Sequence, residues 1–347
     1  MISFRKEDLW SNGSIINCLL INQIISLDCF NFKGYNWLMK RSLFIFLSLT
    51  LFVFCLYQVI SSAAIEDINQ EASLVSIVEF EEEIIPERIA FVGDMMFDRG
   101  VERLMLRNSF TYPVELIKGF LNSFDDVVGN LEGPINEEPE DFPDSSLKFS
   151  FDKKVLDSLY EANFSVLSLA NNHTLNTGEK GLAETRKILN EAEINFTGDP
   201  RICDIADTYS KDGIAYFGIN KTYSFNCSDK EIASSIEEYK FYNPESFLVI
   251  LIHWGNEYEE TNSSQQQKLG RAMIDAGADL VIGSHPHVVQ NIEIYNDKLI
   301  FYSLGNFIFD QYFSKETQQG LIVGLEIYPE EKVYSIYPIE SVLSQPQ

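Results

Sequence analysis

Short apolar runs that each finish in polar residues recur along the chain from Arg88 onward. They read IAFVGD, VVGNLE, VLSLANNH, LVILIHWG and LVIGSHPH. Stretches with helical spacing of apolar residues lie between them, at residues 152–162, 178–193 and 262–276. Apolar strands that alternate with amphipathic helices are typical of an α/β domain whose strands are buried on both faces.

The pattern changes after His287. The segment QNIEIYNDKLIFYSLGNF predicts a β-hairpin that turns at Asn296 and Asp297, and two more strand-like runs follow at residues 320–328 and 332–338. Because the strands of a hairpin pair antiparallel, we expect a mixed sheet.

The longest apolar run covers residues 42–60, which carry no charge and follow Met39-Lys40-Arg41. About 20 apolar residues cross a bilayer as a helix. Apolar side chains occupy every face of this helix, which favours a membrane span over a buried core helix. The basic pair before the run predicts a cytoplasmic N-terminus and an extracytoplasmic C-terminal domain. The length favours an uncleaved signal anchor, and the sequence leaves open whether the chain is cleaved near Ala63-Ala64.

This reading divides the chain into four parts. Residues 1–38 are an N-terminal extension, and residues 39–64 are the signal-anchor transmembrane segment. Residues 65–86 are an acidic stalk, and residues 87–343 are the α/β domain. Met39 resembles the natural start of an exported protein, so translation from Met39 and translation from Met1 are both open.

The amino-acid composition limits the classes of partner that this chain can bind. The net charge is −26, which argues against nucleic acid because phosphate backbones need Lys and Arg. Of the cysteines, only Cys203 and Cys227 lie beyond the predicted anchor, which is compatible with export. The sequence alone does not decide whether these two form a disulfide.

The chain has only four histidines, and each follows an apolar run. Ligands bind at the carboxyl ends of strands in open α/β sheets, so imidazoles at those ends indicate a binding site. The strongest signal is His285-Pro286-His287, where proline favours an extended segment with both imidazoles on the same side. The other two are His173 and His253.

Oxygen donors stand at the same strand ends. Taken alone, Asp94 would more often be a turn or cap residue, Glu132 fits a tight turn between Gly and Pro, and His253 would more often be a hydrogen-bonded core residue. Together with Asn172 they supply carboxylate, imidazole and amide ligands without a thiolate, a set that suits Mn, Fe or Zn. One ion, or two ions about 3.5–4 Å apart, would fit such a set. A histidine outside the ligands would protonate a leaving group, and Arg99 would clamp an anionic substrate.

Six motifs in fixed order carry a family resemblance: GDMMFDR from Gly93, NLE from Asn130, NNH from Asn171, HWGNEY from His253, GSHPHV from Gly283 and YSLGNFIFDQ from Tyr302. This set resembles the capsule-synthesis CapA family, which is associated with poly-γ-glutamate capsule production and export. That family is related to the calcineurin-like metallophosphoesterases. The resemblance covers about residues 88–340 and implies a mixed β-sandwich flanked by helices.

The resemblance also implies roles for individual residues. His173 would be the general acid, and Arg99 would be a catalytic residue on the substrate side. Asn130, Glu257 and Asn306 would face the substrate or support the ligands. The implied metal ligands are Asp94, Glu132, Asn172, His253, His285 and His287.

Two positions depart from the phosphoesterase pattern. Met96 stands where those enzymes carry a histidine two residues after the first aspartate, which puts one of the two metal sites in question. Asn176 stands where the family usually has an aspartate, so the charge at that position is lost.

The resemblance implies a metal-dependent hydrolase or transferase that acts on a phosphoester or on the γ-linked amide of an anionic polymer. The alternative is a non-catalytic component of a polymer synthesis and export complex. Expected partners are the anionic polymer or phosphoester, the membrane and other polymer-synthesis membrane proteins. A soluble housekeeping phosphatase is disfavoured by the anchor.

Overall fold

A computed structural model describes residues 3–5, 85–143, 146–223 and 227–347. All of these belong to one compact unit. The predicted membrane span at residues 42–60 lies outside the described residues, as do nearly all of the predicted extension and stalk. Among the helices that are described, none is long and apolar enough to cross a membrane.

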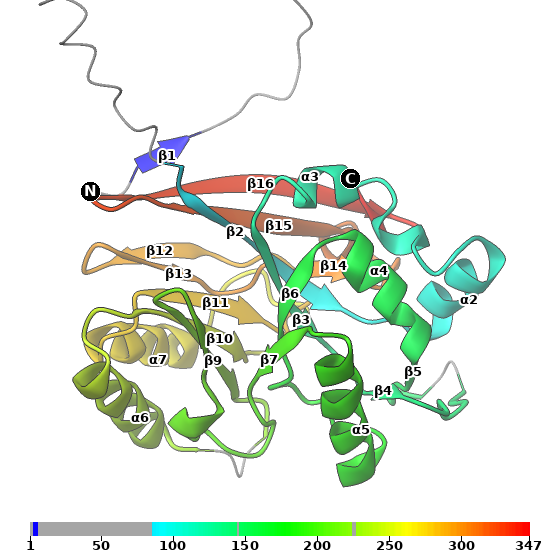
Figure 1. The fold of residues 1–347 in the computed structure, drawn as a ribbon, viewed down its shortest axis with the longest axis horizontal. Coiled ribbons are helices and arrows are strands. Elements are labelled where there is room, and N and C mark those ends of the chain that lie inside the picture. Colours follow the sequence, from blue (N-terminus) through cyan, green and yellow to red (C-terminus); the bar gives the residue numbers. More distant parts are fainter. Residues whose placement is uncertain (1–2, 6–84, 144–145, 224–226) are drawn as a thin grey trace, which may run out of the picture. The chain divides into compact units, whose positions relative to one another are not determined.

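The larger of the two main sheets has the strand order β1-β16-β15-β2-β3-β6-β7, with β14 beside β2 and β17 beside β16 (Figure 1). Strands β2, β3, β6 and β7 run parallel, whereas β15 is antiparallel to both β2 and β16. The mixed character that the sequence predicts is therefore confirmed. The strand bounds are β1 Ser3–Arg5, β2 Glu87–Met95, β3 Asp126–Leu131, β6 Phe164–Ser168, β7 Asn195–Thr197, β14 Asn306–Ile308, β15 Gln319–Ile327, β16 Lys332–Val342 and β17 Gln345–Pro346.

The smaller main sheet has the order β12-β13-β11-β10-β9-β8. Strands β9, β10, β11 and β13 are parallel neighbours, and β8 and β12 are antiparallel edges. A separate short pair joins β4 and β5. The bounds are β4 Ile135–Asn136, β5 Phe151–Asp152, β8 Tyr209–Lys211, β9 Ile214–Asn220, β10 Phe247–His253, β11 Leu280–Ser284, β12 Ile292–Tyr295 and β13 Lys298–Phe301.

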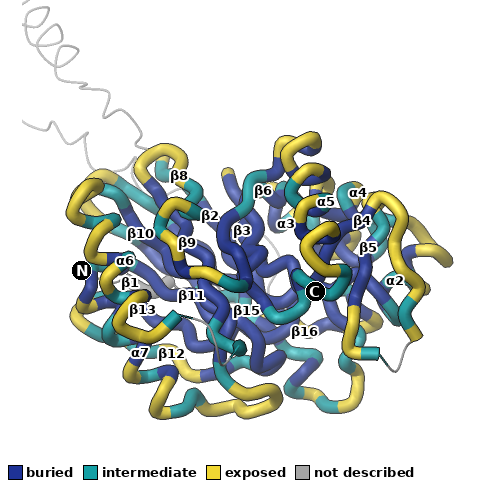
Figure 2. The backbone as a smooth tube through the Cα atoms, turned by 90° about the horizontal axis from the view of Figure 1, so that it is seen from below, coloured by how far each residue is buried: buried dark blue, intermediate teal, exposed yellow. Residues whose placement is uncertain are grey.

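Side-chain alternation along the strands explains why the two sheets pack face to face. In β10, Val249 and Leu251 join a core cluster that also holds Phe91 of β2 and Leu325 of β15. The intervening Ile250 faces the opposite side, toward the helices. Because successive strand residues point to opposite faces, a strand that is covered on both sides needs an unbroken apolar run. Figure 2 shows this core as the dark tubes at the centre, with exposed positions on the loops and helices around it.

Helices cover the outer face of each sheet (Figure 1). Helices α6 and α7 pack on the smaller sheet through residues such as Ile236 and Met273. Side chains of α2, α3, α4 and α5 join the core of the larger sheet, with Leu182 and Leu189 contributed by α5. The bounds are α2 Arg99–Arg107, α3 Lys118–Leu121, α4 Leu156–Glu161, α5 Gly178–Glu191, α6 Asp229–Tyr242 and α7 Ser264–Asp275, and short 3-10 turns occupy Tyr112–Val114, Lys153–Val155, Ile205–Asp207 and Glu316–Gln318.

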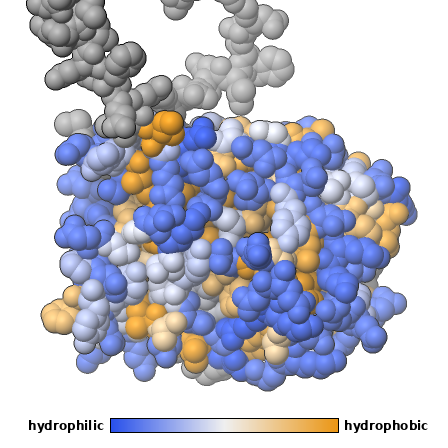
Figure 3. All heavy atoms as spheres, viewed as in Figure 1, coloured by the Kyte–Doolittle hydropathy of each residue, from blue (hydrophilic) through white to orange (hydrophobic). Residues whose placement is uncertain are grey.

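The predicted elements match this arrangement closely. The three predicted helices correspond to α4 with the turn before it, to α5 and to α7. The hairpin is confirmed, and Asn296 and Asp297 have φ angles of 48° and 59°. Positive φ at both central residues is what a type I′ hairpin turn requires. Helices α2 and α6 and strand β9 are additional elements that the sequence pattern did not predict. Hydrophilic side chains cover most of the face seen in Figure 3, in keeping with the large net charge.

Strand β1 has a consequence for the membrane topology. It lies parallel to residues 333–335 of β16. A single crossing at residues 42–60 would put residues 3–5 and β16 on opposite sides of the bilayer. The predicted single crossing therefore requires β1 to separate from β16 in the membrane-anchored protein.

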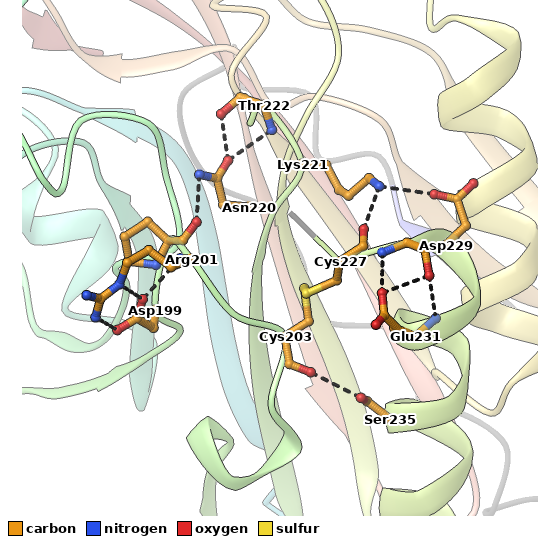
Figure 4. The surroundings of a disulfide bond; sticks show 12 residues. Asp199, Arg201, Cys203, Asn220, Lys221, Thr222, Cys227, Asp229, Glu231 and Ser235 are labelled. Atoms are coloured by element: carbon orange, nitrogen blue, oxygen red, sulfur yellow. Dashed lines mark hydrogen bonds and ion pairs between the residues drawn. A yellow bond between two sulfur atoms is a disulfide. The ribbon is translucent and has the colours of Figure 1, made fainter. Parts of the chain in front are cut away.

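The disulfide question that the sequence left open is decided by the structure. Cys203 and Cys227 are bonded, with their Cα atoms 6.1 Å apart, and they join the segment after β7 to the segment before α6 (Figure 4). On either side of the bond, Ser235 Oγ donates a hydrogen bond to Cys203 O, and Lys221 Nζ donates to Cys227 O. The bond therefore ties α6 to the rim of the smaller sheet.

We expect the double variant Cys203→Ser, Cys227→Ser to have a free energy of unfolding about 3 kcal/mol lower than that of the wild type. The reason is that the disulfide restricts the conformations that the unfolded chain can adopt. Urea unfolding of the oxidised wild type and of the variant measures the difference. Reductant should bring the wild type to the level of the variant and leave the variant unchanged. Equal stability of the oxidised wild type and the variant would contradict this expectation.

Candidate metal centre

The carboxyl ends of parallel strands from both sheets meet at one place. Asp94 is near the end of β2, Glu132 directly follows β3, and His253 is the last residue of β10. Two further imidazoles directly follow β11. Gly93 permits the close packing here, because a Cβ at this position would stand 1.9 Å from Gly305 O. The strand-end location predicted for the polar residues is therefore where the structure places them.

Asp94 is fully buried and receives hydrogen bonds on both oxygens. Asn130 Nδ2 donates to Oδ1 at 2.8 Å, and the backbone N of His285 donates to Oδ2 at 3.1 Å. His287 Nδ1 lies 3.3 Å from the same Oδ2. Burial raises the pKa of Asp94, but the hydrogen bond from His287 and the nearby imidazoles outweigh it and hold this pKa below its usual range. Asp94 is thus built to stay ionised.

Glu132 is also fully buried, but its surroundings are different. Its Oε1 has no hydrogen-bond partner among the described residues. Burial, followed by the charge of Asp94, raises the pKa of Glu132 well above its usual value. The nearest imidazole atoms to Oε1 are His287 Nε2 at 3.6 Å and His173 Nε2 at 3.8 Å.

Those two imidazoles turn lone pairs toward Glu132. His287 Nδ1 donates to Asn306 Oδ1 at 2.9 Å, and His173 Nδ1 donates to Asn176 Oδ1 at 3.0 Å. In the neutral tautomers that these bonds select, both Nε2 atoms are acceptors. When Glu132 is ionised, three acceptor atoms therefore converge without a proton among them, and a cation is the group that resolves such an arrangement.

His253 and Asn172 form a second part of the centre. His253 Nε2 donates to Asn172 Oδ1 at 2.7 Å, while Ser284 Oγ lies 3.1 Å from Nδ1. Burial lowers the pKa of His253 well below its usual value. A neutral imidazole is the form that ligates metals.

The His285-Pro286-His287 segment corrects one expectation. An extended geometry was predicted, but His285 and His287 have φ angles of 99° and 58°. Non-glycine residues in this region are strained, and such strain persists where the surroundings impose it. The two rings nevertheless stay close, with centroids 6.0 Å apart. His285 Nδ1 is buried without a hydrogen-bond partner among the described residues, and burial lowers the pKa of His285 to about 4.

The described residues contain two groups of three side chains whose ligand atoms lie within 4.8 Å of one another. Asp94, Glu132 and His253 form the first group, and all three are buried. The second is made by His285, His287 and the exposed Glu257. The sequence had suggested a substrate-facing or supporting role for Glu257, so its place beside two candidate ligands is new.

The predicted general acid lies beside the centre. The His173 ring is 4.4 Å from that of Phe149, and burial lowers the pKa of His173 to about 4. Asn176 accepts from His173 and also from the backbone N of Phe149, at 2.8 Å. The asparagine at this position therefore orients the imidazole without supplying charge.

Arg99 has a partner that the sequence did not indicate. Its Nη2 donates to Asp310 Oδ1 at 2.5 Å, and its guanidinium lies 4.9 Å from the centre of the Phe149 ring. Asp310 also accepts from the backbone N of Gly100. The two residues are 211 positions apart, and the only signal for Asp310 in the sequence was its place in the motif that begins at Tyr302. The positive charge of Arg99 is balanced by this carboxylate.

Met96 takes no part in either ligand group. It is fully buried in the core between the larger sheet and its helices, and its Sδ accepts a hydrogen bond from the backbone N of Asp98 at 3.0 Å. The histidine that the phosphoesterase pattern would place here is therefore replaced by a packing residue.

Fold and centre together define a class: an α/β protein with a buried cluster of imidazoles and carboxylates that fits a divalent metal ion. The family model described as "Bacterial capsule synthesis protein PGA_cap" matches residues 88–311, and the chain belongs to this family. The resemblance read from the six motifs is thus confirmed.

Two curated relatives support this membership. The chain is 32% identical over 263 residues to the "Capsule biosynthesis protein CapA" of Bacillus anthracis and 31% identical over 254 residues to the "PGA biosynthesis protein CapA" of Bacillus subtilis (strain 168). Each match covers 67% of this chain, but the chain spans only 62% and 66% of the length of these relatives.

Among solved structures, the purple acid phosphatase PPD1 of yellow lupin (Lupinus luteus) overlaps 76% of this chain and 53% of its own. The TM-score is 0.37 and the sequence identity 11%. This overlap is too loose to assign a fold family.

We expect Glu132→Gln to raise the stability of the metal-free protein and to weaken metal binding. Because the pKa of Glu132 is raised in the folded protein, the folded chain holds a proton more tightly than the unfolded chain. The contribution of Glu132 to the stability of the metal-free wild type should therefore fall as the pH rises above about 4.3. We expect the variant to be more stable by about 1–3 kcal/mol at neutral pH in chelator.

Thermal unfolding in chelator and in Mn²⁺ checks this expectation. Saturating metal should raise the midpoint of the wild type, but should raise that of the variant much less. Glu138→Gln, an exposed change of the same kind, is the control and should behave like the wild type. A variant that is less stable than the wild type in chelator would show that the Glu132 carboxylate is satisfied without a cation.

Proposed function

We propose that this protein is a membrane-anchored, extracytoplasmic component of capsule or anionic polymer biosynthesis of the poly-γ-glutamate type. Its centre binds Mn, Fe or Zn and carries out hydrolysis or group transfer on a phosphoester or a γ-linked amide. The observation that carries the proposal is the convergence of Glu132 Oε1 with the Nε2 atoms of His173 and His287, without a hydrogen-bond partner on that oxygen among the described residues. Family membership supplies the biological setting.

The donor set supports a divalent cation. Carboxylates, imidazoles and the amide oxygen of Asn172 are borderline to hard ligands, and the described cysteines are joined in a disulfide. A bound ion would supply Lewis acidity at the centre. The residues that would hold one or two such ions are Asp94, Glu132, Asn172, His253, His285 and His287.

His173 is placed to manage a proton. Its Nδ1 is engaged by Asn176, so Nε2 is the atom that faces the centre. That atom carries a proton only when the ring is cationic, and burial, which lowers the pKa of His173 to about 4, makes this cation a strong acid once it forms. His173 would therefore deliver a proton from Nε2 to a leaving group.

Arg99 would orient substrate rather than attract it over a distance. Its pair with Asp310 leaves little net charge, and the ring of Phe149 holds the guanidinium plane. Its remaining N–H groups can still donate to an anionic oxygen. Asn130, whose amide touches both Asp94 and Glu132, would hold the two carboxylates in place.

One observation favours a second function. Met96 occupies a position where related phosphoesterases carry a ligand, and its side chain is committed to the core. A centre with one weak site could serve a structural role in a non-catalytic component of a polymer synthesis and export complex.

His253→Ala tests the proposal in the full-length chain purified in detergent. We expect the wild type to bind at least one ion per chain after loading with Mn²⁺, Fe²⁺ or Zn²⁺, and the variant to lose most of it. Phosphoester or γ-glutamyl turnover should fall by more than about 100-fold, since even residues that only orient ligands contribute about 10–100-fold. Elemental analysis and product assays measure both quantities.

Glu238→Gln, which alters an exposed residue of α6, is the control and should leave metal and turnover unchanged. Wild-type protein without metal under all three loading conditions would overturn the centre. Metal without turnover on either substrate would favour the non-catalytic component.

Membrane topology is tested separately. If residues 42–60 cross the membrane once, an N-terminal tag should resist protease added to protoplasts, whereas the domain should be released or digested. Accessibility of both the tag and the domain from outside would overturn the single crossing and leave the pairing of β1 with β16 in place.

A further inference from the structure

The loop after β10 returns onto the His285-Pro286-His287 segment. Trp254 N donates to Ser284 O at 3.1 Å, and Tyr258 N donates to Pro286 O at 2.8 Å. Gly255 makes this return with a φ of 91°, and a Cβ there would stand 2.7 Å from Gln266 Nε2. Tyr258 also has a positive φ, of 65°. The backbone is therefore held on both sides of the residue between these anchors, Glu257.

Glu257 consequently stands beside two imidazoles. Its carboxylate and the rings of His285 and His287 each offer a ligand atom within 4.8 Å of the others. His285 is 7% exposed, and its Nδ1 is buried without a hydrogen-bond partner among the described residues. This second observation, independent of Glu257, indicates that the imidazole lacks a group that it was positioned to meet.

The ligand count makes the position of Glu257 significant. The first group, Asp94, Glu132 and His253, already provides three ligands for one ion. Met96 lies in the core and supplies none. A second ion therefore needs a ligand from elsewhere in the chain, and Glu257 is the carboxylate that the return of the loop brings to the two imidazoles.

We propose that Glu257 is a metal ligand that, with His285 and His287, forms a second divalent-ion site beside the one held by Asp94, Glu132 and His253. This inference rests on the proposed function, because it assumes that the centre binds metal. Glu257, an exposed glutamate, would thus supply the ligand that Met96 does not provide.

A second ion would change the net charge of the centre and therefore the substrates that the centre attracts. Three carboxylates face the centre, the imidazoles ligate in their neutral form, and Arg99 is balanced by Asp310. One divalent ion would leave the centre with a charge of about −1, whereas two ions would bring it to about +1. In a chain of net charge −26, only the two-ion centre would attract an anionic substrate.

The test compares Glu257→Gln with the wild type, both as full-length chains stripped by chelator and titrated with Mn²⁺. We expect two ions per wild-type chain. The variant should keep the first ion, while the dissociation constant of the second should rise by at least about tenfold. Calorimetry and elemental analysis give the stoichiometry, and electron paramagnetic resonance should show coupled Mn²⁺ ions in the wild type and isolated Mn²⁺ in the variant. Inorganic phosphate should bind the loaded wild type more tightly than the loaded variant.

Glu259→Gln is the matched control, because it makes the same change at an exposed residue two positions along the same loop. It should bind both ions as the wild type does. Since Glu257 is exposed, the variant should also unfold at the wild-type midpoint in chelator, which excludes misfolding.

The outcomes separate this inference from the proposed function. A second ion bound equally well by the variant and the wild type would overturn the role of Glu257 and leave the metal centre intact. A wild type that binds only one ion would also overturn the role of Glu257 and leave the metal centre intact. A wild type that takes none would overturn both proposals.

Discussion

The structure depends on burying two carboxylates side by side. Asp94 and Glu132 are both fully buried, and ionised groups are costly to remove from water unless they are paired. The protein satisfies the first with an amide, a backbone N–H and an imidazole, but leaves one oxygen of the second without a partner among the described residues. The opposite pKa directions of the two groups express this difference. A bound cation would satisfy this oxygen of Glu132, which is why the centre is best understood as a metal site.

The sandwich is what makes such a centre available. Parallel strands of both sheets end at the same edge, so β2 and β3 supply carboxylates while β10 and β11 lead into imidazoles. The loop after β10 and the segment after β11 are joined by backbone hydrogen bonds, which transmit the rigidity of the sheets to the ligands. Hydrogen-bonding partners such as Asn306 and Asn176 then select which ring nitrogen faces inward.

The chain belongs to a capsule-synthesis family. It is also strongly acidic, with a net charge of −26. Under the proposed function, an anionic polymer would be repelled by such a surface, so the metal ions proposed for the centre would have to supply the attraction. The disulfide agrees with a domain that works in an oxidising compartment, since such bonds persist mainly outside the cytosol. Because Asp310 balances Arg99, the number of bound ions would be the main determinant of the charge at the proposed metal centre.

The amino-acid sequence by itself determined the alternation of strands and helices, the hairpin at Asn296 and Asp297, and the location of polar residues at strand ends. These follow from local periodicity and turn chemistry, which depend on neighbours in the chain. Tertiary structure alone decided the left-handed backbone at His285 and His287, the pairing of Arg99 with Asp310 and the bond between Cys203 and Cys227. It also decided the approach of Glu257 to the imidazoles, because each of these features joins segments that are distant in sequence or is imposed by surrounding packing.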